Sequence, residues 1–358
     1  MKSFIQFSPG PSQLYFTVED HIRNALRNDV ASLSHRSKAF EKIYQSTADG
    51  LKALLGVPAE WNVLFTSSAT EIWERIIENL VDEKSHHFVN GAFSHRFYEI
   101  AQQLKRNPSL TFAAAGGGFS DYHIPPGTEV IALTHNETST GASLPMDFIH
   151  AFRSVHPDAL ITVDAVSSLP YPAFDYTKID SAYFSVQKAF GMPAGLGVWL
   201  VNSRCLAKAE QRLARGYSVG SYHSLVSLVS HAVKYQTPET PNVMGIYVLG
   251  KVVEDMLRRG VTTIRRETDY KAAILYQALE QHPKVKPFVT DKSIQSRTVI
   301  VANTGEHTER LTAFLNEKGI SPGDGYGAAR NSQLRFANFP AHSKEQFELL
   351  VDCLHEFC

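Results

Sequence analysis

Short apolar runs alternate with longer segments of helical periodicity through most of the chain. Residues 17–28 and 37–55 place apolar side chains at helical spacing and predict helices. Residues 62–80 and 86–104 each predict a β-strand, a polar turn and a helix. Further strands are predicted within residues 128–138, 157–170, 181–191 and 195–202. Short strands separated by helices are typical of a mostly parallel sheet covered on both faces, so the expected fold class is α/β.

The pattern changes at a proline-rich stretch that opens residues 237–283, where two long amphipathic helices are predicted. A strand, a helix, a second strand and a last helix are predicted after them, within residues 298–304, 307–319, 333–340 and 343–357. Residues 1–14 are predicted to be extended, because prolines and a glycine interrupt any periodicity. We therefore expect a large domain over residues 15–245 and a small α+β domain over residues 246–358, to which residues 1–14 also belong.

The charge balance argues against two classes of partner. The 35 Lys and Arg nearly balance the 36 Asp and Glu, so no global field points to nucleic acid or to an anionic membrane. No apolar run approaches the roughly 20 residues that span a bilayer, and the first residues lack the apolar stretch of a signal peptide. The three cysteines, Cys205, Cys353 and Cys358, are too few and too scattered for a disulfide framework or a zinc site. We expect a cytoplasmic protein without a metal site that acts on small molecules.

Polar residues stand directly after several predicted strands, at residues 67–70 and 136–140 and at Asp164 and Lys188. In a mostly parallel sheet, ligands collect at the carboxyl ends of the strands. We therefore expect the functional site at this edge of the sheet.

Asp164 and Lys188 are the most informative pair among these residues. Taken singly, Asp164 is more often a helix cap or a loop acid, and a lysine after a strand is more often a surface residue. Together, an amine and a carboxylate at neighbouring strand ends fit pyridoxal 5'-phosphate, because the amine attacks its aldehyde and the carboxylate keeps its pyridine nitrogen protonated. Residues 67–70 open a helix with small hydroxyl side chains, and such a helix start favours an anion such as the cofactor's phosphate. The three features in this chain order predict pyridoxal 5'-phosphate as the cofactor.

Six motifs spread over nearly the whole chain resemble those of one enzyme family. They are HRSKAF at residues 35–40, TSSATE at 66–71, HNETSTG at 135–141, VDAVSS at 163–168, SVQKAFGMPAGLG at 185–197 and QTPETPN at 236–242. In this order they are similar to the class V aminotransferases, which are pyridoxal-phosphate enzymes of fold type I. The resemblance implies an aspartate aminotransferase-like architecture, with a mostly parallel seven-stranded sheet in the large domain and a small α+β C-terminal domain. It also implies a homodimer whose active site lies at the subunit interface.

The resemblance also implies roles for individual residues. Lys188 would be the catalytic residue, since it would form the Schiff base and move the proton. Asp164 would pair with the pyridine nitrogen, Phe93 would stack on the ring, and Thr138 would lie at the phenolic oxygen. The cofactor's phosphate would be held by Gln187, by the backbone N–H groups of Ala69 and Thr70 and, from the second subunit, by Gln236 and Thr237.

Substrate recognition requires cations, because the expected substrates are anions. Arg335, within residues 325–340, matches the family's arginine that grips the substrate α-carboxylate. His35 and Arg36 match a pair that meets the substrate's phosphate across the dimer interface. The segments FSPGP, SHRSKAF and NET are most similar to the branch that forms phosphoserine. That branch transfers an amino group between L-glutamate and 3-phosphohydroxypyruvate, giving O-phospho-L-serine and 2-oxoglutarate in serine biosynthesis.

Three alternatives stay open. The cradle TSSATE, in place of a glycine-rich one, and the single Arg330 ahead of the carboxylate-binding arginine also fit the serine–pyruvate and alanine–glyoxylate branch. A cysteine desulfurase would need a reactive cysteine on a mobile loop, whereas Cys205 closely follows a strand and Cys353 lies on a predicted helix. An inactive interaction protein of the same fold is a third alternative, although the intact lysine–aspartate pair argues against it.

Overall fold

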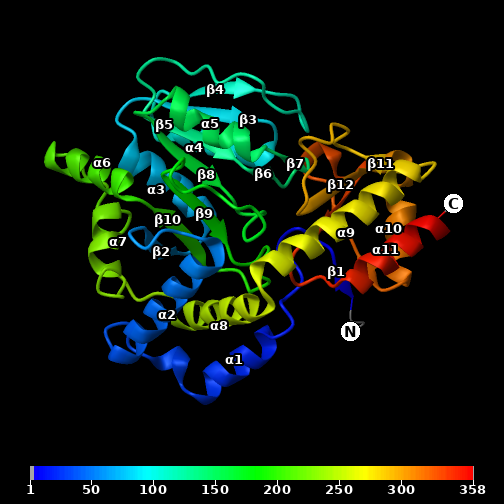
Figure 1. Ribbon diagram of the computed structural model, residues 1–358, viewed down its shortest axis with the longest axis horizontal. Coiled ribbons are helices and arrows are strands. Elements are labelled where there is room, and N and C mark those ends of the chain that lie inside the picture. Colours follow the sequence, from blue (N-terminus) through cyan, green and yellow to red (C-terminus); the bar gives the residue numbers. More distant parts are fainter. Residues whose placement is uncertain (1–3, 358) are drawn as a thin grey trace.

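The computed structural model describes residues 4–357 and has two lobes of unequal size (Figure 1). A seven-stranded sheet forms the centre of the larger lobe, in the order β2-β10-β9-β8-β5-β3-β4. Its strands are β2 (Asn62–Thr66), β3 (Ser85–Val89), β4 (Ser109–Phe112), β5 (Val130–Thr134), β8 (Leu160–Asp164), β9 (Ser181–Ser185) and β10 (Gly197–Val201). Strand β10 runs antiparallel to β2 and β9, and the other pairs are parallel. The predicted α/β class with a mostly parallel seven-stranded sheet is confirmed.

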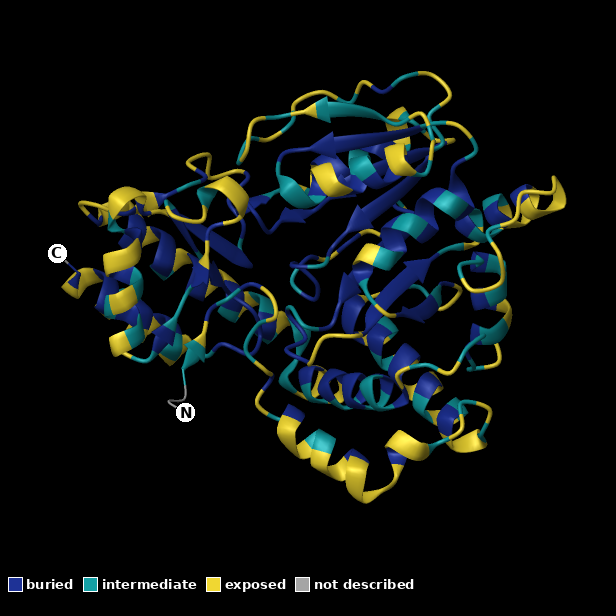
Figure 2. Cartoon of the chain, turned by 180° about the vertical axis from the view of Figure 1, so that it is seen from behind, coloured by how far each residue is buried: buried dark blue, intermediate teal, exposed yellow. Residues whose placement is uncertain are grey.

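The strands of this sheet are buried because helices cover both faces. All five residues of β9 are buried, as are all five of β8, so neither strand alternates between buried and exposed positions. Figure 2 shows most of the strands as a buried layer, with the edge strand β4 only partly buried, while exposed residues lie mainly on loops and on the outer sides of helices. The helices of this lobe are α1 (Val18–Arg27), α2 (Lys38–Leu55), α3 (Ala69–Leu80), α4 (Ala92–Gln103), α5 (Met146–Val155), α6 (Ser203–Ala214), α7 (Leu225–Ala232) and α8 (Val243–Arg259). A short hairpin of β6 (Asn136–Glu137) and β7 (Ala142–Ser143) follows β5.

The smaller lobe has an antiparallel four-stranded sheet in the order β11-β12-β15-β14. Its strands are β11 (Lys286–Pro287), β12 (Val299–Asn303), β14 (Gly323–Asp324) and β15 (Gln333–Ala337). The helices α9 (Val261–Gln281), α10 (Thr308–Glu317) and α11 (Lys344–Glu356) pack around an apolar core of their own. Both ends of the described chain lie in this lobe (Figure 1).

Helix α9 connects the two hydrophobic cores. The larger core extends through α8, which packs against α2, and takes in Ile264 at the start of α9. The smaller core begins at Ala272, further along the same helix. The division of the chain at residue 245 therefore stays a prediction.

The N-terminal segment runs from the smaller lobe to the larger one. Strand β1 (Ile5–Gln6) pairs with β13 (Ile320–Ser321), and the carbonyl oxygen of Phe7 accepts from the N–H of Ala337 at 2.7 Å. Further on, the N–H of Ser12 donates to the carbonyl oxygen of Gln187 at 3.0 Å. This segment therefore passes beside the turn that carries Lys188. Within residues 4–357, no helix combines the length and the apolar character needed to cross a membrane.

Candidate active site

A pocket of about 270 Å³ lies at the carboxyl end of β8 and beside the start of α3. Gly10, Trp73 and Tyr326 line it, although the sequence analysis assigns them no role. Seven of the predicted site residues also line it, namely Ala69, Thr70, Phe93, Thr138, Asp164, Gln187 and Lys188. The polar residues that follow separate strands therefore meet in one cavity.

Asp164 is the last residue of β8 and is only 3% exposed. One carboxylate oxygen accepts from the indole Nε1–H of Trp73 at 3.0 Å, and the other accepts from the N–H of Val166 at 2.9 Å. Burial raises the pKa of Asp164 to about 7, although these two donors and Lys188 act in the opposite direction. Trp73 occupies a buried apolar position of α3, where an indole looks like a core residue in the sequence. Its role as a donor depends on a contact across 91 residues of chain.

Lys188 lies in the turn after β9, where its carbonyl oxygen accepts from the N–H of Gly191 at 2.9 Å. Burial lowers the pKa of the Lys188 ammonium to about 8, and the nearby guanidinium of Arg335 lowers it further, against the carboxylates of Asp164 and Glu137. Its Nζ lies 5.8 Å from the ring centroid of Phe93. The amine can therefore lose its proton close to neutral pH while it faces the open pocket.

Gly10 closes the pocket beside this amine. A Cβ on Gly10 would lie 2.2 Å from Nζ of Lys188, and the glycine has a φ of +154°. Only glycine meets both conditions without strain. The Pro-Gly-Pro segment in the sequence is the signal that could have pointed to it.

The start of α3 forms the predicted anion cradle. The Ser68 hydroxyl accepts from the N–H of Glu71 at 3.2 Å, and the N–H of Ala69 donates to the Ser185 hydroxyl at 2.8 Å. A Cβ on Gly197 would lie 2.5 Å from Oγ1 of Thr66 and 2.6 Å from the carbonyl carbon of Ser68, so a glycine in β10 is what lets this turn fit against the sheet. The N–H of Ala69, predicted to bind the phosphate, is thus occupied by Ser185, whereas the N–H of Thr70 and the dipole of the helix start favour an anion at this place.

Asn136 and Thr138 lie on the opposite wall and share one partner. The Asn136 Nδ2–H donates to Oγ of Ser167 at 2.8 Å, and the Thr138 hydroxyl donates to the same oxygen at 2.7 Å. The side-chain oxygen of Asn136 is buried and has no hydrogen-bond partner in the described chain, and Asn136 lines the pocket. This wall can therefore accept a hydrogen bond from a bound molecule.

Glu137 is fully buried and caps the start of α4. One carboxyl oxygen accepts from the N–H and the hydroxyl of Ser94, both at 2.9 Å, and the other accepts from the Ser139 hydroxyl at 2.6 Å. A Cβ on Gly91 would lie 2.3 Å from Cγ of Glu137, so glycine is required there. The sequence analysis uses the motif that contains Glu137 only for its resemblance, whereas the carboxyl group fixes the first turn that carries Phe93.

Arg335 reaches the site from β15 of the smaller lobe. Its Nε–H donates to the carbonyl oxygen of Asp324 at 2.6 Å, and Nη1 donates to the carbonyl oxygen of Thr138 at 3.4 Å. The second contact crosses from the smaller lobe to the wall of the Lys188 pocket.

The remaining predicted residues form a separate cluster. The guanidinium of Arg36 donates to Oε1 of Gln236 at 3.0 Å and to the carbonyl oxygen of Thr237 at 2.7 Å. His35 lies beside Thr240, with 3.3 Å between Nδ1 and Oγ1, and burial together with the charge of Arg36 lowers the pKa of His35. None of these residues is among the described residues that line the Lys188 pocket. The structure therefore brings these four predicted residues together, but not into the pocket of their own chain.

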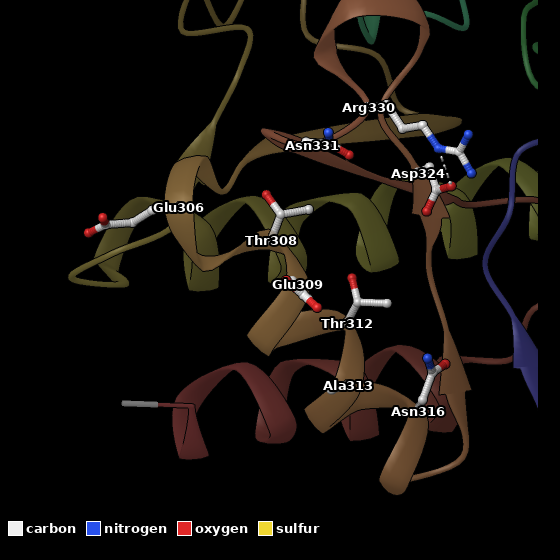
Figure 3. A pocket seen from close by; sticks show the side chains of 9 residues that line it. All are labelled: Glu306, Thr308, Glu309, Thr312, Ala313, Asn316, Asp324, Arg330 and Asn331. Atoms are coloured by element: carbon white, nitrogen blue, oxygen red, sulfur yellow. Dashed lines mark ion pairs between the residues drawn. The ribbon is translucent and has the colours of Figure 1, made fainter.

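Arg330 faces a different groove of the smaller lobe (Figure 3). Its Nε lies 3.3 Å from a carboxylate oxygen of Asp324, and its side chain is 73% exposed. The groove is lined by α10 and the 324–331 segment, outside the Lys188 pocket. Arg330 therefore adds no positive charge to that pocket.

Two of the three cysteines are buried away from any open surface. Burial raises the pKa of the Cys205 thiol, whose Sγ points to the carbonyl oxygen of Asp180 at 3.4 Å. Burial also raises the pKa of the Cys353 thiol, and Cys358 lies outside the described residues. Neither described thiol has the exposed, electropositive surroundings of a reactive cysteine.

Known proteins resemble this chain along its whole length. It shares 50% identity with a phosphoserine aminotransferase of Cytophaga hutchinsonii in a crystal structure, which covers 100% of this chain and 99% of that chain with a TM-score of 0.98. It is 27% identical over 349 residues to a phosphoserine aminotransferase of Rhodococcus opacus, which covers 95% of this chain and 90% of that protein. An alanine–glyoxylate aminotransferase structure from Nostoc sp. has a TM-score of 0.84 at 20% identity, covering 99% of this chain and 95% of that chain, and shows the fold alone.

Residues 5–337 match the family model of class-V aminotransferases. The matched segment contains Asp164 and Lys188, which line one pocket in the structure, and Arg335, which contacts the carbonyl oxygen of Thr138 in the wall of that pocket. The resemblance carried by the sequence motifs is therefore confirmed, and the chain belongs to the class V aminotransferase family.

Proposed function

We propose that this aminotransferase binds pyridoxal 5'-phosphate in the Lys188 pocket and transfers an amino group between L-glutamate and 3-phosphohydroxypyruvate. The products are 2-oxoglutarate and O-phospho-L-serine, a step of serine biosynthesis. One observation supports the proposal most strongly. Lys188, an amine of lowered pKa, and Asp164, a buried carboxyl group, line the same pocket. The 50% identical relative of full length bears the name of the same activity.

The residues present fit the cofactor. The start of α3 offers its dipole and the backbone N–H of Thr70 for the phosphate, with Gln187 beside it. Asp164 offers a carboxylate for the ring nitrogen, and the unpartnered oxygen of Asn136 can accept a hydrogen bond. When bound, pyridoxal phosphate supplies an aldehyde that carries the amino group and a ring that takes up electrons.

Lys188 moves the proton in this proposal. An ammonium whose pKa is about 8 both takes up and releases a proton readily at neutral pH, which suits a general acid and base. The charge of Arg335 and the burial of the pocket set that pKa, while Asp164 limits the shift. Because Gly10 has no side chain, it leaves room for Nζ of Lys188, which a Cβ at this position would approach to 2.2 Å.

Arg335 binds the substrate α-carboxylate in this proposal. Its guanidinium donates to two backbone carbonyls, from Asp324 and Thr138, which restrain two of its N–H directions before a ligand arrives. A guanidinium can donate two parallel hydrogen bonds to a carboxylate, which a lysine cannot do.

The second anionic group of the substrate needs another source of cations. Among the described residues that line the pocket, Lys188 is the only cation, and Arg330 faces the other groove. We assign the phosphate to His35 and Arg36 of a second subunit in a homodimer, where Gln236 and Thr237 accompany them and lie beside the cofactor's phosphate. The clustering of these four residues outside their own chain's pocket supports this arrangement.

The same scarcity of cations favours a second candidate function. If a second subunit contributes no cation to the pocket, the pocket would suit an unphosphorylated keto acid, as in an aminotransferase of the alanine–glyoxylate type. Mixing Lys188→Ala chains with Arg36→Leu chains tests the shared site, because only hybrid dimers then contain one intact site. Activity that appears on mixing two inactive variants supports the shared site, and an Arg36→Leu protein of normal activity contradicts it.

The choice of substrate is tested with the purified wild-type protein, L-glutamate and one keto acid at a time. We expect 3-phosphohydroxypyruvate to give a higher kcat/KM than pyruvate or glyoxylate. Turnover of glyoxylate or pyruvate without turnover of the phosphorylated acid would reject the leading proposal in favour of the second one.

A further inference from the structure

Tyr326 lines the Lys188 pocket from a tight turn flanked by two glycines. A Cβ on Gly325 would lie 2.1 Å from the carbonyl oxygen of Ala329, and Gly327 has a φ of +56°. The turn is closed by a hydrogen bond from the N–H of Ala329 to the carbonyl oxygen of Tyr326 at 3.1 Å. The close approach at Gly325 and the closed turn therefore place Tyr326 more strictly than an ordinary surface side chain.

The ring of Tyr326 contacts two residues of the site, Arg335 and Phe93. Cζ of Arg335 is 5.5 Å from the ring centroid. The ring centroids of Tyr326 and Phe93 are 5.0 Å apart with 49° between their planes. Phe93 belongs to the larger lobe, and Arg335 to the smaller one. Tyr326 therefore connects the arginine of one lobe to the aromatic residue that faces Lys188 in the other.

The Tyr326 ring adds to the hydrogen bonds that already orient the guanidinium of Arg335. Two N–H groups of the guanidinium already donate to the carbonyl oxygens of Asp324 and Thr138, and these bonds restrain two of its directions. An aromatic face attracts a cation and excludes water from one side of it. Since Tyr326 is 43% exposed and lines the pocket, its ring forms the outer wall against which a bound carboxylate must be placed.

We propose that Tyr326 is a positioning residue for the substrate carboxylate: its ring holds the plane of Arg335 at the angle that a carboxylate needs, and its hydroxyl is dispensable. The proposal rests on the function assigned above to Arg335, namely the binding of a substrate carboxylate. It concerns every substrate of the enzyme, because each carries an α-carboxylate.

The test compares Tyr326→Leu, which removes the ring, with Tyr326→Phe, which keeps it. Rapid mixing of the cofactor-loaded protein with L-glutamate alone gives the apparent dissociation constant and the maximal rate of the first half-reaction. We expect Tyr326→Leu to raise the dissociation constant roughly three- to tenfold, the range for a cation over an aromatic ring, with little change in the maximal rate. Tyr326→Phe should restore the wild-type constant. Calorimetric binding of maleate, an unreactive dicarboxylate, should show the same pattern.

Tyr217→Leu serves as the matched control. Tyr217 is 48% exposed and lies under Arg212 and Arg215, at 4.9 and 5.5 Å, but outside the Lys188 pocket. It therefore removes a similar ring–guanidinium contact without touching the site. Unchanged glutamate and maleate binding in Tyr326→Leu would overturn the proposal, and so would a Tyr326→Phe protein as weak as Tyr326→Leu. These readouts involve no keto acid, so failure of 3-phosphohydroxypyruvate as a substrate would reject the proposed function without touching this inference.

Discussion

Gly10 and Lys188 are in such close contact that a single added carbon on the glycine would lie 2.2 Å from Nζ and 2.5 Å from Cε of the lysine. Gly10 belongs to the segment that links the two lobes, and the N–H of Ser12, two residues later, donates to the carbonyl oxygen of Gln187. The position of the reactive amine therefore depends on a residue almost 180 positions away in the chain.

We expect Gly10→Ala to lower kcat by roughly a hundredfold, because moving a reacting group by about 1 Å has an effect of that order. The φ of +154° adds strain to any side chain at this position. Steady-state kinetics and a thermal unfolding curve of the same protein measure the two effects. Gly305→Ala is the matched control, since Gly305 also has a positive φ, of +50°, but nothing within 4 Å of its Cβ position. Equal kinetics in both variants would contradict this role of Gly10.

The hydrogen bond between Trp73 and Asp164 sets the pH range in which Asp164 is ionised. The indole N–H donates to the carboxylate and favours its charged form, so Trp73→Phe should raise the pKa of Asp164 above about 7. The carboxyl group then stays protonated to higher pH and pairs less well with a protonated ring nitrogen. Fluorescence titration of the apoprotein should show weaker binding of pyridoxal phosphate at pH 6.5, about tenfold for one lost bond to a charged group, and a smaller deficit at pH 8.5.

Trp199→Phe is the control for this variant. Its buried indole N–H donates to the Ser181 hydroxyl at 2.8 Å, within the same sheet but away from the pocket. A cofactor affinity that changes equally in both variants, or changes without dependence on pH, would argue against the assignment.

The charge of Arg335 helps to keep the amine of Lys188 reactive. A neighbouring cation disfavours a second positive charge, so Arg335→Leu should raise the pKa of Lys188 above about 8. Reductive methylation of Lys188 in the apoprotein, followed by peptide mass spectrometry, reports the fraction of uncharged amine. In the wild type the rate should level off above about pH 8, and in the variant at a higher pH. Arg330→Leu, at the exposed arginine beside Asp324, should leave the profile unchanged.

Glu137 stabilises the larger lobe through its cap on α4. In Glu137→Gln, an NH₂ group faces donors that now bind a carboxyl oxygen, and the buried Ser94 N–H loses its acceptor. We expect the free energy of unfolding to fall by about 3 kcal/mol, which urea denaturation of the apoprotein measures. Asp291→Asn is the control, because the exposed Asp291 also accepts from an N–H and a hydroxyl, both of Ser293, and should lose less than about 1 kcal/mol. A Glu137→Gln protein as stable as this control would contradict the capping role.

The sequence predicts the part of the site that depends on strand ends. Asp164 follows a buried strand and Lys188 follows the next strand along the chain, and parallel strands bring such residues to one edge of the sheet. The pattern of apolar residues also predicts a mostly parallel sheet and the helices α1 and α2, whereas the number of seven strands is implied by the family resemblance. These features are local, or follow from a general rule of sheet topology.

The residues that the sequence analysis leaves without a role act through contacts between distant parts of the chain. Trp73 looks like any apolar residue of a helix until its N–H is seen beside Asp164, and Tyr326 looks like a loop residue until Arg335 is placed over its ring. Arg36 and Gln236 are 200 residues apart, and only the family motifs put them in one functional group. No local pattern contains such pairings, because they arise when separate elements pack.

The chemistry proposed for the pocket depends above all on which lysine carries the cofactor. Borohydride reduction fixes pyridoxal phosphate to whichever lysine amine holds it, and peptide mass spectrometry then locates the pyridoxyl group. Lys271 is the natural competitor, because it is also buried and its pKa is lowered to about 7, but its Nζ donates to the carbonyl oxygens of Phe339 and His342. We predict a single modified position, Lys188, and no modification of the Lys188→Ala protein. A pyridoxyl group on Lys271 or another lysine, or none in the wild-type protein, would contradict the account.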